Sequence, residues 1–281
     1  MRAKRGEHWR IADLPWADFE AAKVDPELLR IVKAAALVEY NADDYATYLA
    51  NVFSGDDVFQ AAIRNWALEE RQHGEALRDW AQRADPTFDF QVAFSRFISG
   101  YRINVDADQS VRGSQLGELV SRCIVETGTS SYYTMLGDAA DEPVLKALCR
   151  LIAADELRHY KLFYTHLKRT SAAQEMGRWA RLKVALGRVQ ESEDDELAFA
   201  YFAANAPPQA VFDRAQYSSA YLVRAFPLYR PAHFEQMIAM ISRVCGLKLS
   251  SFLRRLLKRI AQEIVSIKIK RAHSVLRQKA A

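Results

Sequence analysis

Six side chains of the kinds that bind metals occur in this chain as one short pattern written twice. The pattern is a lone glutamate followed by a Glu-x-x-His motif, present as Glu39, Glu70 and His73 and again as Glu126, Glu156 and His159. The lone glutamate precedes its motif by 31 residues in the first copy and by 30 in the second. Four carboxylates and two imidazoles, supplied in this order by four helices, are the ligand set of a two-metal carboxylate site in a helical bundle.

Each Glu-x-x-His motif can present both of its side chains to one side of a helix. Residues three apart in an α-helix are separated by about 60° around the axis, so they project from one face. Glu70 and His73 share such a face, and so do Glu156 and His159. Either motif alone is usually two solvated polar residues, but two motifs, each preceded by a glutamate, predict that both faces point into one interior.

The two lone glutamates follow apolar residues, which is an unusual setting for an acid that faces solvent. Glu39 follows Ala-Ala-Ala-Leu-Val at residues 34–38, and Glu126 follows Cys-Ile-Val at residues 123–125. An unpaired buried carboxylate is very costly, and binding a metal is one of the few ways to offset that cost. We therefore expect both glutamates to be metal ligands.

The donor atoms favour iron over zinc. Oxygen-rich ligation with one imidazole per metal suits iron or manganese, whereas structural zinc favours thiolates. Availability and redox chemistry make two iron ions, cycling between Fe2+ and Fe3+, the first choice, with manganese as the alternative. In such a site Glu70 and Glu156 bridge the metals, and the remaining ligands complete one shell each: Glu39 with His73, and Glu126 with His159.

Helix signals divide the first part of the chain into two long helices. Asp25-Pro26-Glu27 is typical of a helix start, with a capping acid followed by proline in the first turn. It predicts a first helix over residues 26–53, which carries the first lone glutamate. A second helix is expected over residues 57–83, antiparallel to the first because the connection between them is short.

The second pair of helices follows a long crossover. Residues 86–113 are mixed in character and are expected to be partly helical. A third helix is predicted over residues 114–140, and Asp141-Glu142-Pro143 opens a fourth that ends near residue 170. The four-helix core therefore occupies residues 26–170.

Composition predicts an all-α protein with one large core. Half of the 281 residues are hydrophobic, and there are only 11 glycines and 8 prolines. The long stretches between them have helical rather than alternating periodicity. Around the core we expect an N-terminal segment over residues 1–25, accessory helices packing on the bundle over residues 171–245, and a basic amphipathic C-terminal helix over residues 246–281.

The cysteines and the N-terminus suggest a cytoplasmic protein. Cys123, Cys149 and Cys245 form no Cys-x-x-Cys pair, which suits a reducing compartment. The basic residues 1–10 are followed by no apolar segment of a signal peptide, and no run of 18 apolar residues occurs. We therefore predict neither a signal peptide nor a membrane span, while peripheral attachment to a membrane stays open.

Two segments around the motifs resemble the acyl-acyl-carrier-protein desaturases. Residues 66–77, Trp-Ala-Leu-Glu-Glu-Arg-Gln-His-Gly-Glu-Ala-Leu, are similar to that family's Trp-x-x-Glu-Glu-Asn-Arg-His-Gly-Asp segment. Residues 151–159, Leu-Ile-Ala-Ala-Asp-Glu-Leu-Arg-His, are similar to its Ala-Ala-Asp-Glu-Lys-Arg-His segment. The resemblance covers the four-helix core, about half of the chain, and does not extend past residue 170.

The resemblance implies a ferritin-like four-helix bundle with additional C-terminal helices. It implies a di-iron enzyme that reduces O2 and oxidises an acyl chain, desaturating or hydroxylating it in an apolar channel, with electrons from an external donor. It also implies a homodimer, and an apolar small molecule or a carrier-bound acyl group as substrate. The family's iron ligands correspond to the six ligands named above.

Three more residues match positions that related O2-activating enzymes use. Asp155 and Glu69, each directly before a motif glutamate, occupy places where second-shell acids orient the histidine of the opposite motif. Thr129, one turn after Glu126, matches an active-site threonine that O2-activating members share. Each has an ordinary alternative: the acids could face solvent, and the threonine could pack or bond to its own backbone.

The basicity of the protein belongs to its C-terminal tail. The net charge of the chain is +4. From Arg243 to the end there are eleven Lys or Arg residues and one acid, Glu263, a net charge of +10, so residues 1–242 carry a net charge of −6. Apolar residues recur at helical spacing from Leu249 to Ile267. The helix could simply dock on the bundle, or it could bind an acidic carrier protein or an anionic membrane surface. The scarcity of aromatic residues in the tail argues against nucleic acid.

The ligand set leaves three functions open. The first is the di-iron oxidase just described, the second is a ferroxidase or peroxidase like ferritin or rubrerythrin, and the third is a membrane- or partner-binding helical protein with a structural metal site. About 110 residues beyond the bundle and the lack of a rubredoxin-like cysteine set argue against the second. The sequence does not identify the substrate, the electron donor, the oligomeric state, or the choice among desaturation, hydroxylation, N-oxygenation and C–C cleavage.

Overall fold

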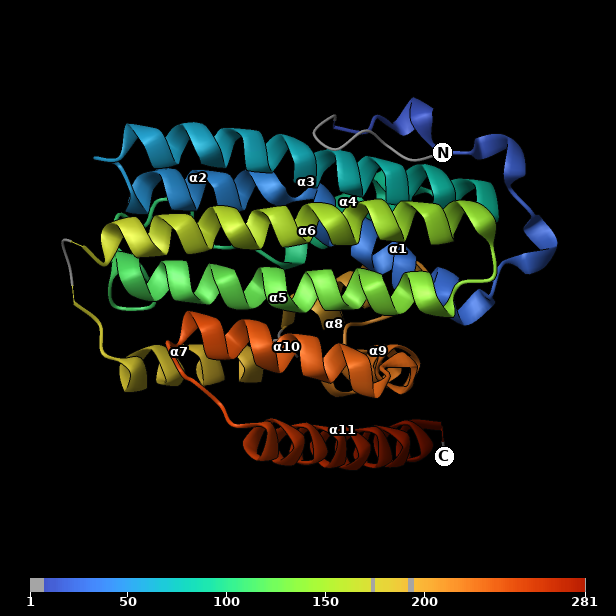
Figure 1. Ribbon diagram of the computed structural model, residues 1–281. Helices are drawn as coiled ribbons and strands as arrows, with labels where there is room; N and C mark the ends of the chain where they lie inside the picture. Colours follow the sequence, from blue (N-terminus) through green and yellow to red (C-terminus); the bar gives the residue numbers. More distant parts are fainter. Residues whose placement is uncertain (1–7, 173–174, 192–194, 281) are drawn as a thin grey trace.

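The computed structural model describes residues 8–172, 175–191 and 195–280, and helices form nearly all of its regular structure (Figure 1). Before residue 170 the α-helices are α1 (Pro26–Tyr40), α2 (Ala42–Val52), α3 (Asp57–Ala84), α4 (Phe90–Gly100), α5 (Gln115–Ala139) and α6 (Pro143–Thr170). They are followed by α7 (Arg178–Glu191), α8 (Asp195–Asn205), α9 (Arg214–Ala225), α10 (Pro231–Val244) and α11 (Ser251–Ala280). No strand occurs in the described ranges, so the all-α, ferritin-like prediction is confirmed.

Some of the predicted segments extend beyond the described residues. These are the basic residues 1–7 of the N-terminal segment, residues 173–174 and 192–194 of the accessory region, and residue 281. The described N-terminal part forms three short 3-10 helices, η1 (Ile11–Asp13), η2 (Trp16–Asp18) and η3 (Ala21–Lys23), and a fourth, η4 (Phe226–Leu228), joins α9 to the segment before α10.

The bundle consists of the four helices that carry the candidate ligands. α1 packs on α3, α5 packs on α6, and α3 also contacts α6. Three side chains cap the helices where the sequence predicts their starts. Asp25 accepts hydrogen bonds from two backbone N–H groups of α1, Ser114 accepts one at α5, and Glu142 accepts two at α6. The crossover between α3 and α5 contains α4, as its mixed sequence suggested.

The first predicted helix is wrong in one respect, because it is two helices rather than one. Its backbone leaves the helical conformation at Asn41, with φ −87° and ψ 17°, between α1 and α2. The break comes directly after Tyr40, whose backbone touches α3 at Gly74: a Cβ on Gly74 would lie 2.5 Å from the Tyr40 nitrogen. The interruption therefore lies next to a close contact between α1 and α3, and no glycine or proline near position 41 indicates it.

The accessory helices pack on one side of the bundle, against α1 and α5, and α11 lies outermost (Figure 1). α8 packs on α1 and α4, α9 packs on α8 and α1, α7 and α10 pack on α5, and α11 packs on α9 and α10. Tyr201 and Tyr221 of these helices are buried in the same apolar cluster as Leu37 and Trp80 of the bundle. Among the helices in the described ranges, none combines the length and the apolar character needed to cross a bilayer.

Candidate metal centre

The structure brings together the six residues that the sequence selected as ligands. Glu39 comes from α1, Glu70 and His73 from α3, Glu126 from α5, and Glu156 and His159 from α6. All six are buried, with at most 9% of the residue exposed. Four helices therefore direct four carboxylates and two imidazoles into one interior, where carboxylates are costly unless a cation or a proton neutralises them.

The ligand atoms form two overlapping groups, each the right size for one cation. The first contains Glu39 and His73, the second contains Glu126 and His159, and both contain Glu70 and Glu156. Within each group the ligand atoms all lie within 4.8 Å of one another. Two carboxylates shared between two groups have the arrangement that a bridging pair requires.

The two imidazoles turn the same ring nitrogen toward the carboxylates. His73 Nδ1 lies 3.2 Å from Glu70 Oε2, 3.2 Å from Glu156 Oε1 and 4.0 Å from Glu39 Oε2. His159 Nδ1 lies 3.1 Å from Glu70 Oε1 and 3.8 Å from Glu126 Oε2. The Nδ1 lone pairs of both rings can therefore reach the space between the carboxylates when Nε2 carries the proton.

The opposite nitrogen of each ring faces an acid of the other motif. His73 Nε2 lies 3.1 Å from Asp155 Oδ2, and His159 Nε2 lies 2.9 Å from Glu69 Oε2. Both acids are the residues for which the sequence suggested this position. A carboxylate that accepts the Nε2–H proton fixes the tautomer and the orientation of a ligating imidazole.

Further residues hold these two acids, and the sequence did not point to them. Trp9 Nε1 donates to Asp155 Oδ2 at 2.8 Å, and its ring stacks on that of His73 with centroids 6.1 Å apart. Arg158 spans both acids, donating to Asp155 and, at 3.1 Å, to Glu69. Nδ1 of the largely exposed His8 lies 3.2 Å from Glu69 Oε1.

Two hydroxyl groups on α5 contact the ligands directly. Thr129 Oγ1 donates to Glu156 Oε2 at 2.6 Å, and it also bonds weakly to the backbone of its own helix at 3.3 Å. Tyr133, which is fully buried, donates its hydroxyl hydrogen to Glu39 Oε1 at 2.5 Å. Tyr133 follows Glu126 by seven residues, so helical spacing could have indicated that it shares the inward face.

Burial and crowding shift the pKa values of the ligands in opposite directions. Burial, reinforced by the neighbouring carboxylates, raises the pKa of Glu39 and of Glu126 well above the usual value. Burial also acts to raise the pKa of Glu70, but the charge and hydrogen bond of His159 outweigh it and hold that pKa well below the usual value. For His73, burial is outweighed by hydrogen bonds to Asp155 and Glu156, so its pKa is raised well above the usual value. Without a bound cation, burial and mutual repulsion therefore disfavour the charged forms of Glu39 and Glu126.

Several polar atoms of the site have no hydrogen bond to satisfy them. Within the described part of the chain, these include both carboxylate oxygens of Glu126, Glu156 Oε1 and His159 Nδ1. Buried polar atoms are nearly always bonded to something, so such a cluster requires an explanation. A cation bound between the carboxylates would supply it, and the oxygen-rich donor set with one nitrogen on each side would suit iron or manganese.

The comparisons with known proteins were consistent with one another. Residues 20–218 match the protein family described as Fatty acid desaturase. The match therefore continues past residue 170, and the expectation that the resemblance ends there is wrong. The chain is also 27% identical over 118 residues to a Mycobacterium tuberculosis protein assigned by name as acyl-acyl-carrier-protein desaturase DesA2, in strains CDC 1551 / Oshkosh and ATCC 25618 / H37Rv. That match covers 41% of this chain and 40% of the relative, so the chain spans about two fifths of the length of the curated relatives it matches.

Proposed function

Because the chain belongs to the fatty acid desaturase family, we propose that it is a non-haem di-iron oxidoreductase that uses O2 to desaturate or hydroxylate an acyl or similar lipid-like substrate. The observation that carries this proposal is the pair of overlapping carboxylate and histidine groups in the bundle interior. Two iron ions, when bound, would supply the redox chemistry that reduces O2 and removes hydrogen from the substrate, with further electrons from an external donor.

The six ligands divide naturally between the two ions. Glu39 and His73 would hold one ion, Glu126 and His159 would hold the other, and the two remaining glutamates would bind both. Asp155 and Glu69 keep the Nε2–H proton on each histidine, because a charged acceptor lies within 3.1 Å of each Nε2 atom. Each Nδ1 atom then offers its lone pair to a cation.

We assign Thr129 a role next to the shared carboxylates. Its hydroxyl lies 2.6 Å from Glu156 Oε2, so it can donate a hydrogen bond to that oxygen or hold a proton beside it. The contact of the same hydroxyl with the Val125 carbonyl oxygen is longer, at 3.3 Å, so the bond to Glu156 is the stronger of the two. Thr129→Val keeps the shape and removes the hydroxyl. We expect it to leave the iron content unchanged and to lower the yield of oxidised product per O2 consumed.

The substrate class follows from the family and from the relative's name. DesA2 is named for acyl-acyl-carrier-protein substrates, and we propose the same acyl class for this chain. The form in which the acyl group arrives, on a carrier protein or as a smaller thioester, is the part that experiment must decide.

The two alternative functions use the same ligands. A ferroxidase or peroxidase would need no organic substrate, and a structural site would need no turnover. Membership in the desaturase family favours the oxidase over both.

The test is anaerobic loading of the protein with Fe(II), addition of O2, and analysis of products from acyl-carrier-protein and acyl-CoA substrates. The proposal expects an oxidised acyl product and its loss in Glu156→Ala, together with loss of iron. Turnover of peroxide without any acyl product would favour the peroxidase. Full activity in Glu156→Ala would contradict the assignment of the site.

A further inference from the structure

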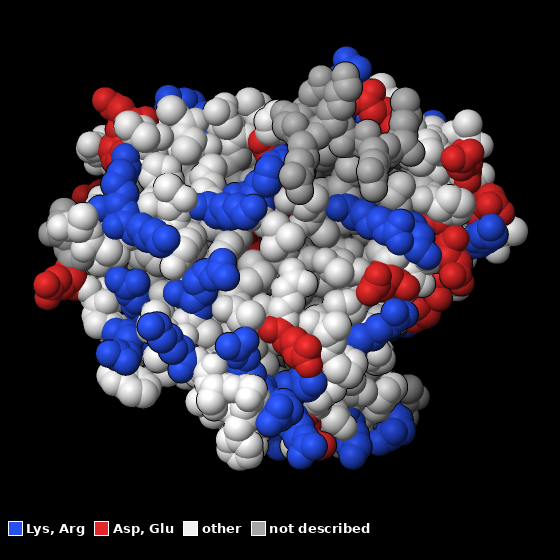
Figure 2. All heavy atoms as spheres, in the orientation of Figure 1, with Lys and Arg blue, Asp and Glu red and all other residues white. Residues whose placement is uncertain are grey.

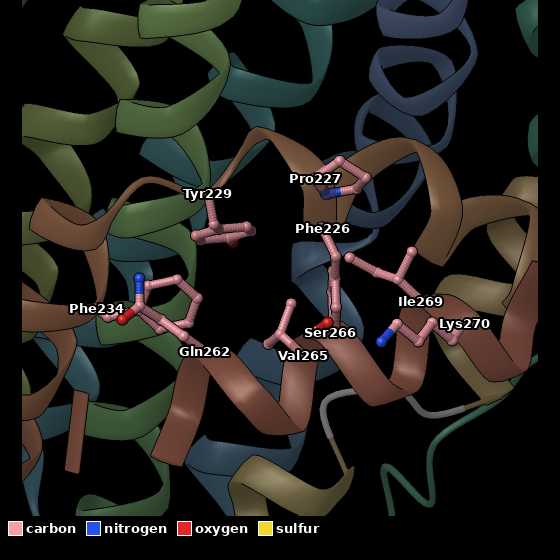
Figure 3. Close-up of a pocket in the computed structure, with 9 residues that line it drawn as sticks. All are labelled: Phe226, Pro227, Tyr229, Phe234, Gln262, Val265, Ser266, Ile269 and Lys270. Carbon is pink, nitrogen blue, oxygen red and sulfur yellow. The ribbon is translucent and has the colours of Figure 1, made fainter. Parts of the chain in front are cut away.

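The C-terminal helix α11 has two apolar faces, and the described part of the chain covers one of them. On the inner face, Val265 and Ile269 point toward Phe226 and Tyr229 (Figure 3), and Ala272 is 4% exposed. This face packs on α9, η4 and α10. The inner face therefore explains why α11 docks on the rest of the protein. It does not explain why the outer face of α11 is also apolar.

The outer face carries a row of large apolar side chains, which we call the outer stripe. Their exposed fractions range from 37% to 67%, and the residues are Phe252, Leu253, Leu256, Ile260, Ile264 and Ile267. From Leu253 onward they recur every three or four residues, and Phe252 precedes them, so they form one continuous band along the first half of the helix. Single exposed apolar residues are ordinary, but a continuous exposed band marks an interaction site.

Positive charge surrounds the outer stripe. Exposed cations of α11 lie beside it, among them Arg255, Arg259, Lys270 and Arg271, and Glu263 is the only acid after Arg243. Figure 2 shows Lys and Arg side chains gathered over the lower part of the molecule, where Figure 1 draws α11, with few acids among them. An apolar band with flanking cations is complementary to a surface that is apolar inside and anionic outside.

A cavity beneath the same helix has matching chemistry. It measures about 300 Å³, at the lower end of the volumes that hold small ligands, and lies between α11, η4 and α10. Its lining is mainly apolar and aromatic, with Phe226, Tyr229 and Phe234 facing Val265, and with Lys270 at its edge (Figure 3). An apolar space next to a single cation suits the acyl chain of an anionic amphiphile.

We propose that α11 attaches the protein to an anionic lipid bilayer, with the outer stripe inserted at the level of the headgroups and acyl chains. A second copy of the chain fits this surface poorly, because its own α11 would bring the same positive charges into contact. An acidic carrier protein would match the cations, but it would not by itself require six large apolar side chains exposed to water. The attachment is independent of the metal centre, so it can hold whether or not the proposed function is correct.

The test is co-sedimentation of the full chain with vesicles of two compositions. We expect binding to vesicles of phosphatidylcholine and phosphatidylglycerol at about one to one, and weak binding to phosphatidylcholine alone, because surface charge attracts the cations. Raising the salt from about 0.05 M to about 0.5 M should weaken binding, since the screening length falls several-fold.

A double variant of the outer stripe and a matched control locate the binding surface. Leu256→Asp with Ile260→Asp should lower the partition coefficient at least about tenfold, because both side chains lose their apolar contact. The control, Val58→Asp with Val92→Asp, makes the same change at exposed residues of α3 and α4 and should leave binding unchanged. Circular dichroism establishes whether each variant is folded.

A charge variant keeps the test decisive if the apolar variant does not fold. Arg255→Gln with Arg259→Gln leaves the outer stripe intact and should lower partitioning about 30-fold on anionic vesicles. Failure of the unmodified chain to bind anionic vesicles would overturn the proposal, as would equal binding by the α11 variants. The proposal would also be overturned if the unmodified chain did not bind vesicles but bound an acidic acyl carrier protein or itself, and the α11 variants abolished that binding.

Discussion

Replacing Asp155 with asparagine tests whether the acids behind the histidines tune the metal centre. The Asp155 side chain is 3% exposed and accepts from Trp9 at 2.8 Å and from His73 at 3.1 Å. Asparagine keeps the shape but removes the negative charge, and its single oxygen cannot replace both carboxylate oxygens. His73 then loses the charged acceptor that holds its Nε2–H proton.

The expected loss is 10- to 100-fold in affinity for Fe(II), the range typical of second-shell substitutions, or about 1.4–2.7 kcal/mol. Glu69→Gln should have a smaller effect, at the low end of that range, because the Glu69 side chain is 22% exposed and water can replace part of its interaction. An anaerobic titration with Fe(II), followed by an optical probe, measures both affinities.

The control for Asp155→Asn is Asp138→Asn, which removes the negative charge beside His233, a histidine outside the metal centre. That variant should leave Fe(II) affinity unchanged. Thermal unfolding of the metal-free proteins separates metal binding from folding. If Asp155→Asn lowers only the stability and shifts Fe(II) affinity less than twofold, the positioning argument is refuted.

Four further substitutions test other parts of the structure. Gly74→Ala places a methyl group 2.5 Å from a backbone nitrogen of α1 and should lower the free energy of unfolding, measured by urea titration, by about 3 kcal/mol. Its control is Gly187→Ala. The methyl group added there lies in open space, so this substitution should raise the free energy of unfolding by about 0.5–1 kcal/mol. Asp85→Asn should cost about 1–2 kcal/mol at pH 7, because Lys33 lies 2.6 Å away and holds the pKa of Asp85 below its usual value. Because the pKa of Asp85 is lower in the folded protein, ionised Asp85 stabilises the fold fully at pH values above its pKa in the unfolded chain, which is near 3.9. The difference in thermal stability between wild type and Asp85→Asn should therefore shrink as the pH falls from about 5 toward 2. Tyr133→Phe removes a 2.5 Å hydrogen bond to Glu39 on α1 and should destabilise the metal-free protein by about 1–2 kcal/mol. An unchanged midpoint of thermal unfolding would mean that the hydroxyl group does not contribute to stability.

The helices and the ligands were predictable because each depends on local spacing. A three-residue step fixes which face of a helix two side chains share, so Glu70 with His73 could be placed without knowing the fold. Helix starts were equally local, since Asp25 and Glu142 act on backbone groups within three residues.

Features that depend on tertiary contacts were not predictable in this way. Trp9 reaches Asp155 across 146 residues of sequence, and no spacing rule links the two. The break at Asn41 lies beside the close contact of Tyr40 with Gly74, and that contact becomes apparent only when the helices are packed. The sequence also indicated that α11 is amphipathic. Which of its apolar residues stay exposed once the helix is docked could be seen only in the packed structure.

The central claim is that the bundle interior holds two iron ions between shared carboxylates. Metal analysis after anaerobic loading with Fe(II), on wild type and on Glu156→Ala, tests it most directly. The account predicts about two iron ions per wild-type chain, with an optical spectrum of coupled ions after oxidation, and a clear loss of iron in the variant because both groups contain Glu156. Iron well below two per chain in the wild type, or an undiminished iron content in Glu156→Ala, would contradict it.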